Sequence, residues 1–154
     1  MVQRPKPQNA AMNKRFQVNE MIGEYRVTSF LGEGGMGEVY LGVHEKLGRP
    51  AAIKILHSNI SDESFKTRFF NEARLQASLH HPNIAALYDF QEQGNELLIF
   101  MEFVDGESLD DLVARRAFSI NESLDVFASV CEAVGYIHQN GIVHRDIKAQ
   151  NIKL

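Results

Sequence analysis

The 154-residue sequence contains a single cysteine, Cys131, no tryptophan and only four prolines. One cysteine excludes an internal disulfide and is compatible with a reducing compartment. No apolar run approaches the roughly 18 residues that a membrane-spanning helix needs, and the N-terminus lacks the apolar stretch of a secretory signal. We therefore expect a cytoplasmic chain with no membrane segment.

The chain also lacks an excess of positive charge. It has 16 Lys and Arg against 20 Asp and Glu, a net charge of -4. Four basic residues precede the first acidic one, and the remainder is acidic, so we expect no nucleic-acid partner. The basic start also contains Pro5 and Pro7, and residues 1–23 are predicted to be a flexible leader in preference to a docking arm.

With 44% hydrophobic and 23% charged residues, the chain falls in the globular class. Residues 25–31 and 38–44 both have β-like composition, and four glycines lie between them at positions 32 to 37. A dinucleotide-binding turn would need a helix directly after the glycines. The alternation after Gly37 favours a hairpin instead. On these residues alone, a glycine-rich turn without a ligand remains the alternative.

The remaining pattern predicts strands, helices and one linker. The expected elements are a strand at 51–56, a helix from a cap at Ser61 or Asp62 to about Leu79, strands at 84–90 and 96–101, a linker at 102–106, and helices at 108–116 and 121–139. Ser119 and Glu122 form a capping-box pattern before the last helix. Cys131 falls on the apolar stripe of that helix, which predicts a core thiol.

Two charged residues leave alternatives open. Lys54 interrupts an apolar strand, and such a lysine either extends its ammonium into water or reaches phosphates held under a neighbouring glycine hairpin. Glu72 forms either a surface pair with Arg68 or a pair that directs Lys54. After the last helix, the stretch from His144 to Asn151 places a carboxylate, an ammonium and an amide at short intervals, which is typical of a phosphoryl-transfer loop.

Four motifs occur in one order, and through them residues 25 to 154 resemble the eukaryotic-like Ser/Thr protein kinases, particularly bacterial members. The motifs are Leu31-Gly32-Glu33-Gly34-Gly35-Met36-Gly37-Glu38-Val39-Tyr40, Ala51-Ala52-Ile53-Lys54, His81-Pro82-Asn83-Ile84 and His144-Arg145-Asp146-Ile147-Lys148-Ala149-Gln150-Asn151. The resemblance implies an α+β, protein-kinase-like fold in a partial kinase domain, residues 24–154. It comprises a five-stranded antiparallel small lobe with one helix (24–101), a hinge (102–106) and the incomplete start of a helical large lobe (107–154).

The resemblance implies transfer of the ATP γ-phosphate to Ser or Thr hydroxyls of protein substrates. Lys54 would hold the α- and β-phosphates, with Glu72 orienting its ammonium. Asp146 would accept the proton of the substrate hydroxyl, Lys148 would lie beside the γ-phosphate, and Asn151 would bind Mg²⁺. His144 is expected to be a buried structural residue.

An ATP site is implied by the same resemblance. Its glycines let backbone N–H groups approach the phosphates, while other residues surround the adenine and ribose. The implied ATP-binding residues are Gly32, Glu33, Gly34, Gly35, Gly37, Val39, Ala52, Lys54, Met101, Glu102, Val104 and Asp111.

Some kinase features are absent from these 154 residues. The Asp-Phe-Gly segment and the activation segment do not occur, and Lys153 stands where the family usually has an aliphatic residue under the adenine. We expect a truncated kinase that is inactive as this fragment, with the apolar stripe of helix 121–139 available for a partner or self-association. The alternatives are a non-catalytic nucleotide- or partner-binding module and a nonfunctional remnant.

Overall fold

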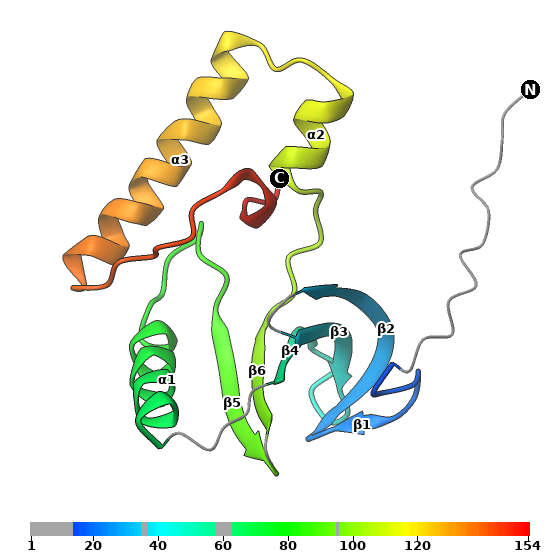
Figure 1. Cartoon of the computed structure of the whole chain (residues 1–154). Coiled ribbons are helices and arrows are strands. Elements are labelled where there is room, and N and C mark those ends of the chain that lie inside the picture. The colour runs from blue at the N-terminus through cyan, green and yellow to red at the C-terminus, as the bar shows by residue number, and fades with distance from the viewer. Residues whose placement is uncertain (1–13, 35–36, 58–62, 95) are drawn as a thin grey trace, which may run out of the picture.

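The computed structural model describes residues 14–34, 37–57, 63–94 and 96–154, without the side chains of residues 57, 63–66 and 68 (Figure 1). Three predictions concern residues outside this description. They are the helix cap at Ser61 or Asp62, the phosphate contact of Gly35, and the pairing of Arg68 with Glu72.

A six-stranded antiparallel sheet forms the small lobe, with strand order β1-β2-β3-β4-β6-β5. The strands are β1 (Met21–Ile22), β2 (Tyr25–Gly34), β3 (Gly37–His44), β4 (Pro50–His57), β5 (Leu87–Gln93) and β6 (Glu96–Glu102). Alternate residues of the strands point to one side of the curled sheet. There Tyr40, Ile53 and Phe100 are fully buried and form the core. The antiparallel small lobe is therefore confirmed, with one strand more than predicted.

The additional strand corrects the predicted leader, residues 1–23. Met21 and Ile22 pair with β2, and Ile22 is 1% exposed. Phe16 also packs against the core. Phe16 and Ile22 are isolated apolar residues in a polar stretch with no periodicity to reveal them, and their contact with the core depends on the curl of the sheet. Residues 14–22, which we call the N-terminal segment, are thus part of the lobe.

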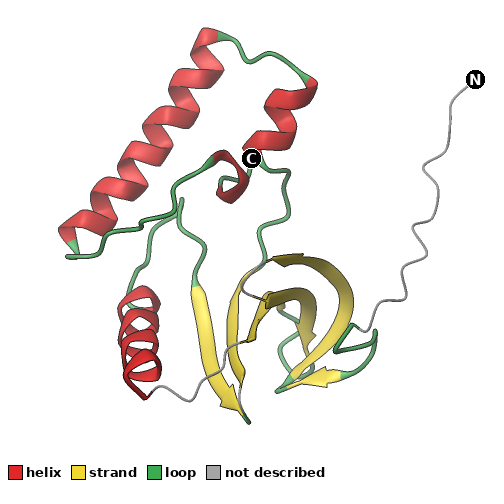
Figure 2. Ribbon diagram, in the orientation of Figure 1, coloured by secondary structure: helices red, strands yellow, loops and turns green. Residues whose placement is uncertain are grey.

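Four helices accompany the sheet among the described residues (Figure 2). They are α1 (Glu63–Ala77), α2 (Leu109–Arg115), α3 (Ile120–Gln139) and the short 3₁₀ helix η1 (Ala149–Asn151). α1 packs beside β5, where the Phe70 and Phe90 rings lie 5.3 Å apart. The capping box of α3 is confirmed, because Ser119 and Glu122 exchange both side-chain-to-backbone hydrogen bonds.

Tyr136 of α3 contacts the small lobe. The hydroxyl of Tyr136 accepts a hydrogen bond from His80 N at 3.2 Å, and its ring lies 5.1 Å from the His81 ring. His80 and His81 belong to the loop between α1 and β5. The contact therefore lies at the far end of α3 from the linker that continues β6.

The apolar stripe of α3 is largely exposed. Cys131 is exposed, so the prediction of a core thiol is wrong; the side chains that α3 buries are Ala133 and Ile137. Ile120 and Phe127 are 80% and 66% exposed, and together with Phe118 of the preceding loop they line an open depression of about 410 Å³ at the start of α3. Within the described part of the chain, no helix has the length and apolar character to cross a membrane.

Candidate functional site

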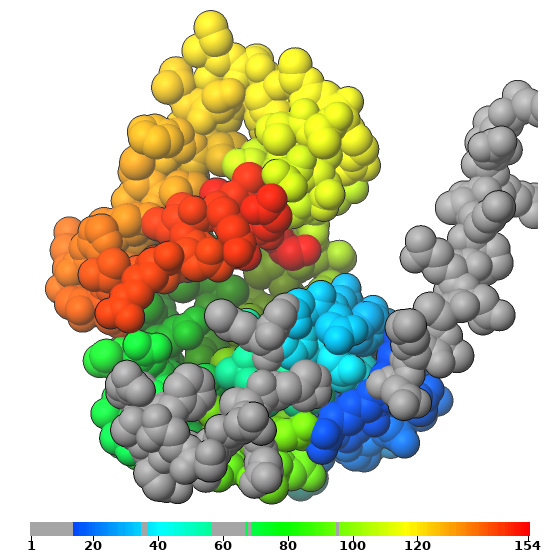
Figure 3. Space-filling view, viewed as in Figure 1, coloured from blue at the N-terminus to red at the C-terminus, as the bar shows by residue number. Residues whose placement is uncertain are grey.

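The segment after α3 returns across the surface between the helices and the small lobe (Figure 3). It ends against the start of α2, where Glu107 and Leu154 exchange backbone hydrogen bonds of 3.2 and 3.0 Å. The ammonium of Lys153 donates to the carbonyl of Gly106 at 2.8 Å. These bonds hold the loop 144–151 against the linker that connects β6 to α2. The sequence marks Lys153 as unusual because kinases usually have an aliphatic residue at this position. It did not predict the hydrogen bond to the Gly106 carbonyl.

Asp146 is the centre of the loop. Its Oδ2 lies 3.0 Å from Lys148 Nζ and accepts a hydrogen bond from Asn151 Nδ2 at 2.9 Å. The same amide nitrogen donates to the Asp146 carbonyl at 2.9 Å, and Asp146 N donates to His144 Nδ1 at 3.3 Å. The structure therefore brings the three predicted loop residues together. His144 is exposed, so its predicted burial is wrong; its role here is to accept the loop hydrogen bond.

The pKa of the Asp146 carboxyl is lowered from its ordinary value. The hydrogen bond from Lys148 is the largest cause, and the hydrogen bond from Asn151 is the next. Asp146 is consequently a carboxylate at neutral pH. A carboxylate in this position can accept a proton or a hydrogen bond from a hydroxyl group.

Replacing Lys148 by Met should raise the pKa of Asp146 toward its ordinary value, because the main hydrogen bond to the charged form is removed. The folded-state pKa is depressed, so the stability from these contacts is present above the unfolded-state pKa and is lost as pH falls through the folded-state pKa. A ¹³C NMR titration of the Asp146 carboxyl measures the change. Lys153→Met is the matched control, since its ammonium bonds Gly106 instead. An unchanged Asp146 pKa in Lys148→Met would contradict this assignment.

The glycines of the β2–β3 hairpin fall into two kinds. A Cβ built on Gly32 or Gly34 meets no described atom within 4 Å. A Cβ on Gly37 would lie 1.8 Å from the carbonyl oxygen of Ile55, and Gly37 has φ +143°. Gly32 and Gly34 thus leave backbone open to a ligand, while Gly37 is required by close packing against β4. Packing against β4 is therefore a second reason for glycine at position 37, in addition to its predicted role in phosphate approach.

Four predicted ATP-site residues lie on one face of the sheet. Val39 is directly opposite Lys54 in the β3–β4 register, and Ala52 is directly opposite Met101 in the β4–β6 register. Lys54 and Ala52 are two residues apart on β4, so their side chains leave the same face. This face is the one opposite the core that contains Tyr40. The strand register therefore places Val39, Ala52 and Met101 on one apolar surface together with Lys54.

The remaining predicted contacts are spread along the linker and α2. Glu102 and Val104 are exposed, and Glu102 Oε2 accepts a hydrogen bond from Ala86 N at 3.0 Å. Asp111 is also exposed, and its Oδ2 accepts a hydrogen bond from Ser108 Oγ at 2.6 Å within the cap of α2. Glu33 is exposed opposite Glu38 in the hairpin. The structure does not bring these residues into contact with Lys54.

The predicted pair between Lys54 and Glu72 does not form in the described structure. Glu72 Oε1 instead lies 3.8 Å from Arg145 Nη1. Both of these side chains are more than 70% exposed, at 78% for Arg145 and 72% for Glu72, so their pairing contributes little stability. Arg145 has φ +65°, which places its backbone in the left-handed region that non-glycine residues rarely adopt. The Arg145 contact is one that sequence reasoning missed.

The residues of this chain fit a magnesium site only in part. The amide nitrogen of Asn151 is engaged with Asp146, which leaves its amide oxygen for a metal. Among the described residues, no three His, Cys, Asp or Glu side chains converge as metal ligands. Mg²⁺ usually takes one or two carboxylates together with substrate phosphates. Asn151 would therefore supply one ligand, and the described residues do not form a complete site.

The hairpin, the lysine-bearing face and the Asp146 loop together match a protein kinase domain, whose family model covers residues 25–154. The chain therefore belongs to the protein kinase family. Its relatives include the serine/threonine-protein kinase Pkn2 of Myxococcus xanthus, 41% identical over 131 residues and 84% of this chain. PknB of Mycobacterium tuberculosis is 40% identical over 142 residues and 88% of this chain.

The fold agrees with a solved kinase structure. The kinase domain of M. tuberculosis PknI superposes with a TM-score of 0.80 at 32% identity over 90% of this chain. This chain spans 16% of Pkn2, 23% of PknB and 58% of the solved PknI chain. The predicted kinase fold is confirmed.

Proposed function

We propose that this chain is the ATP-binding part of a kinase that transfers the γ-phosphate of ATP to Ser or Thr hydroxyls of proteins. The observation that carries the proposal is the shared face of Val39, Lys54, Ala52 and Met101. It offers an apolar surface for a purine with a lysine at one end for phosphate. The Ser/Thr specificity is supported by Lys148 in the loop and by the names of the bacterial relatives.

The proposal assigns the site residues separate roles in binding phosphate, substrate hydroxyl and magnesium. Lys54 binds phosphate oxygens, and the open backbone at Gly32 and Gly34 receives the phosphates from the other side. Asp146 orients the substrate hydroxyl and accepts its proton, while Lys148 balances the carboxylate charge. Magnesium would neutralise phosphate charge when bound, with Asn151 as one ligand. We also propose a cytoplasmic location, where ATP is available.

The test is to measure nucleotide binding and phosphate transfer separately. We expect Mg-ATP to raise the midpoint of thermal unfolding of the 154-residue chain, because a ligand that binds only the folded state stabilises it. We expect no transfer of ³²P to a serine peptide, since the described residues supply only part of a magnesium site. Transfer by this chain would disprove the expected inactivity, and absence of any ATP effect would count against the proposed function.

A non-catalytic nucleotide-binding module is the second candidate. The observation that favours it is the contact of Glu72 with Arg145 in place of Lys54, because this arrangement leaves the lysine without its directing carboxylate. The two candidates differ in a longer protein that contains this chain. Such a protein transfers phosphate under the first proposal and only binds ATP under the second.

A further inference from the structure

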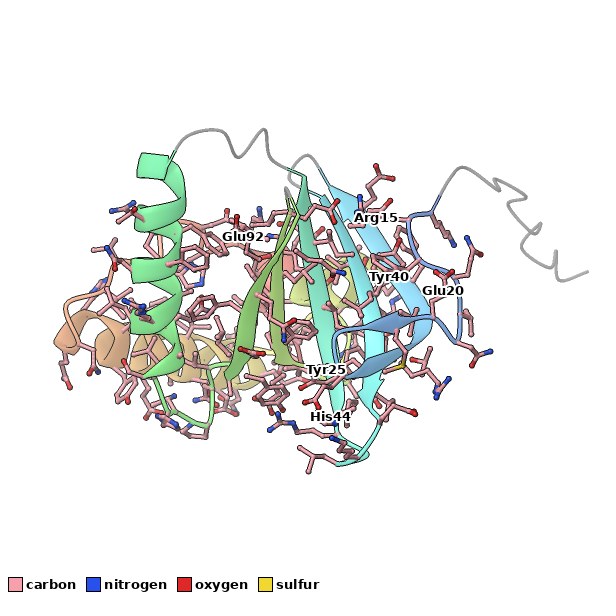
Figure 4. All side chains as sticks on the ribbon, turned by 90° about the horizontal axis from the view of Figure 1, so that it is seen from below. Arg15, Glu20, Tyr25, Tyr40, His44 and Glu92 are labelled. Carbon is pink, nitrogen blue, oxygen red and sulfur yellow. The ribbon has the colours of Figure 1, made fainter. Side chains whose placement is uncertain are left out.

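The N-terminal segment packs on the strands of the glycine hairpin although it lies outside the matched kinase region, residues 25–154. Figure 4 labels Arg15 and Glu20 of this segment and Tyr40 of the sheet, and Phe16, the neighbour of Arg15, packs on the Tyr40 ring. Tyr40 belongs to β3, the strand that leaves the hairpin. The segment is thus placed where it can affect the hairpin.

Aromatic rings connect the segment to both hairpin strands. The Phe16 ring meets the fully buried Tyr40 ring edge-on, with centroids 5.9 Å apart. Phe30 of β2 meets Tyr40 from the paired strand at 5.4 Å. Lys14 Nζ lies 4.5 Å from the Phe30 ring centroid, a cation–π contact. Tyr40 is therefore enclosed between the segment and β2.

A hydrogen-bond path runs from the segment to the residue after Gly37. Phe16 N donates to the Tyr40 hydroxyl at 3.3 Å, and this hydroxyl donates to Glu38 Oε2 at 2.6 Å. Glu38 is 7% exposed, and a buried carboxylate is costly unless it is hydrogen-bonded. Burial and the bond to Glu38 raise the pKa of Tyr40, so its hydroxyl keeps the donated proton.

The segment is held at two further points. Arg15 forms an ion pair with Glu96, whose side chain is 11% exposed at the start of β6. Met21 and Ile22 pair with β2. These contacts fix the segment on three strands, so Phe16 has a defined position against Tyr40.

We propose that the N-terminal segment positions the glycine hairpin for the phosphates of ATP, with Phe16 and Tyr40 as positioning residues. The proposal rests on the proposed ATP-binding function. Because strand side chains alternate, Tyr40 and Glu38 lie on the face opposite Val39. The segment therefore acts on the hairpin from the core side and does not contact the nucleotide.

The experiment compares Phe16→Ala, the conservative Phe16→Leu, and Val18→Ala in the 154-residue chain. Val18 belongs to the same segment but is 58% exposed, so it is a matched control. The dissociation constants of Mg-ATP and adenosine are measured by calorimetry, and amide hydrogen exchange is followed in residues 37–40 and in α3. Adenosine lacks the phosphates on which the hairpin acts.

We expect Phe16→Ala to weaken Mg-ATP binding by about 3–10-fold, the scale of one aromatic contact, and to change adenosine binding by less than about twofold. Exchange should increase in residues 37–40 and stay unchanged in α3. Phe16→Leu should recover most of the affinity, and Val18→Ala should behave as the wild type.

Two results would overturn the proposal. One is wild-type ATP affinity and wild-type exchange in Phe16→Ala. The other is an equal loss for ATP and adenosine with faster exchange throughout the chain, which indicates general destabilisation. If the wild type binds no ATP, the proposed function fails, while exchange in residues 37–40 still decides whether the segment orders the hairpin.

Discussion

Gly37→Ala should lower the free energy of unfolding by about 3 kcal/mol or more, a large part of the 5–15 kcal/mol typical of a folded domain. The new Cβ would lie 1.8 Å from the Ile55 carbonyl oxygen and 2.9 Å from its carbon, both backbone atoms of β4. Relief requires the two strands to separate. The φ of +143° adds strain for any residue with a Cβ. Urea or thermal unfolding followed by circular dichroism measures the loss.

Gly34→Ala provides the control for this substitution, because its Cβ meets no described atom within 4 Å. We expect its unfolding free energy to stay within about 0.5–1 kcal/mol of wild type. Its ATP affinity should nevertheless fall, since the methyl group occupies the backbone face open to phosphate. Equal stability of the Gly37→Ala and Gly34→Ala proteins would refute the division of the hairpin glycines into two kinds.

Lys54→Met should weaken Mg-ATP binding about 10- to 100-fold, because a hydrogen bond to a charged group contributes roughly 1.5–3 kcal/mol. Met keeps the length and apolar character of the stem, so the fold should be retained. Calorimetry with Mg-ATP measures the affinity. Lys46→Met is the matched control, since its ammonium lies 3.5 Å from Glu24 on the surface.

The same measurement on Glu72→Gln tests the observed pairing. Glu72 lies beside Arg145 and forms no ion pair with Lys54 in the described structure. We therefore expect less than about a threefold change in ATP affinity for Glu72→Gln. A loss as large as that of Lys54→Met would show that Glu72 directs the lysine when nucleotide is bound.

Local patterns predicted most of the fold because they depend on neighbouring residues. The hairpin around Gly37 and the capping box at Ser119 need only short-range spacing, and both are present. The shared face of Lys54 and Ala52, which was not predicted, follows from the same short spacing, two residues along β4. Ile22 of β1, by contrast, is buried only because the sheet curls around it, and no local pattern records that curl.

Among the groupings predicted for the site, the one of residues close in sequence formed and the one between distant residues did not. Asp146, Lys148 and Asn151 are close in sequence, so a short loop brings them together. Lys54 and Glu72 lie on different elements, and their distance depends on how α1 sits against the sheet. The exposure of Cys131 has a similar origin, since a helical stripe reports an apolar face and not what covers it.

The contacts of Tyr136 and Lys153 restrict the motion of the helical part relative to the small lobe. Lys153 and Leu154 bind the loop 144–151 to Gly106 and Glu107, so this loop moves with the helical part. Among the described residues, the other connections include residues 103–105 of the linker, the hydroxyl of Tyr136 against His80, and the exposed ion pair of Arg145 with Glu72. We expect rotation about a line through the linker and the Tyr136 contact, because the exposed Arg145–Glu72 pair holds the two parts together only weakly. Opening about this line would carry Asp146 away from Lys54 as part of a rigid body.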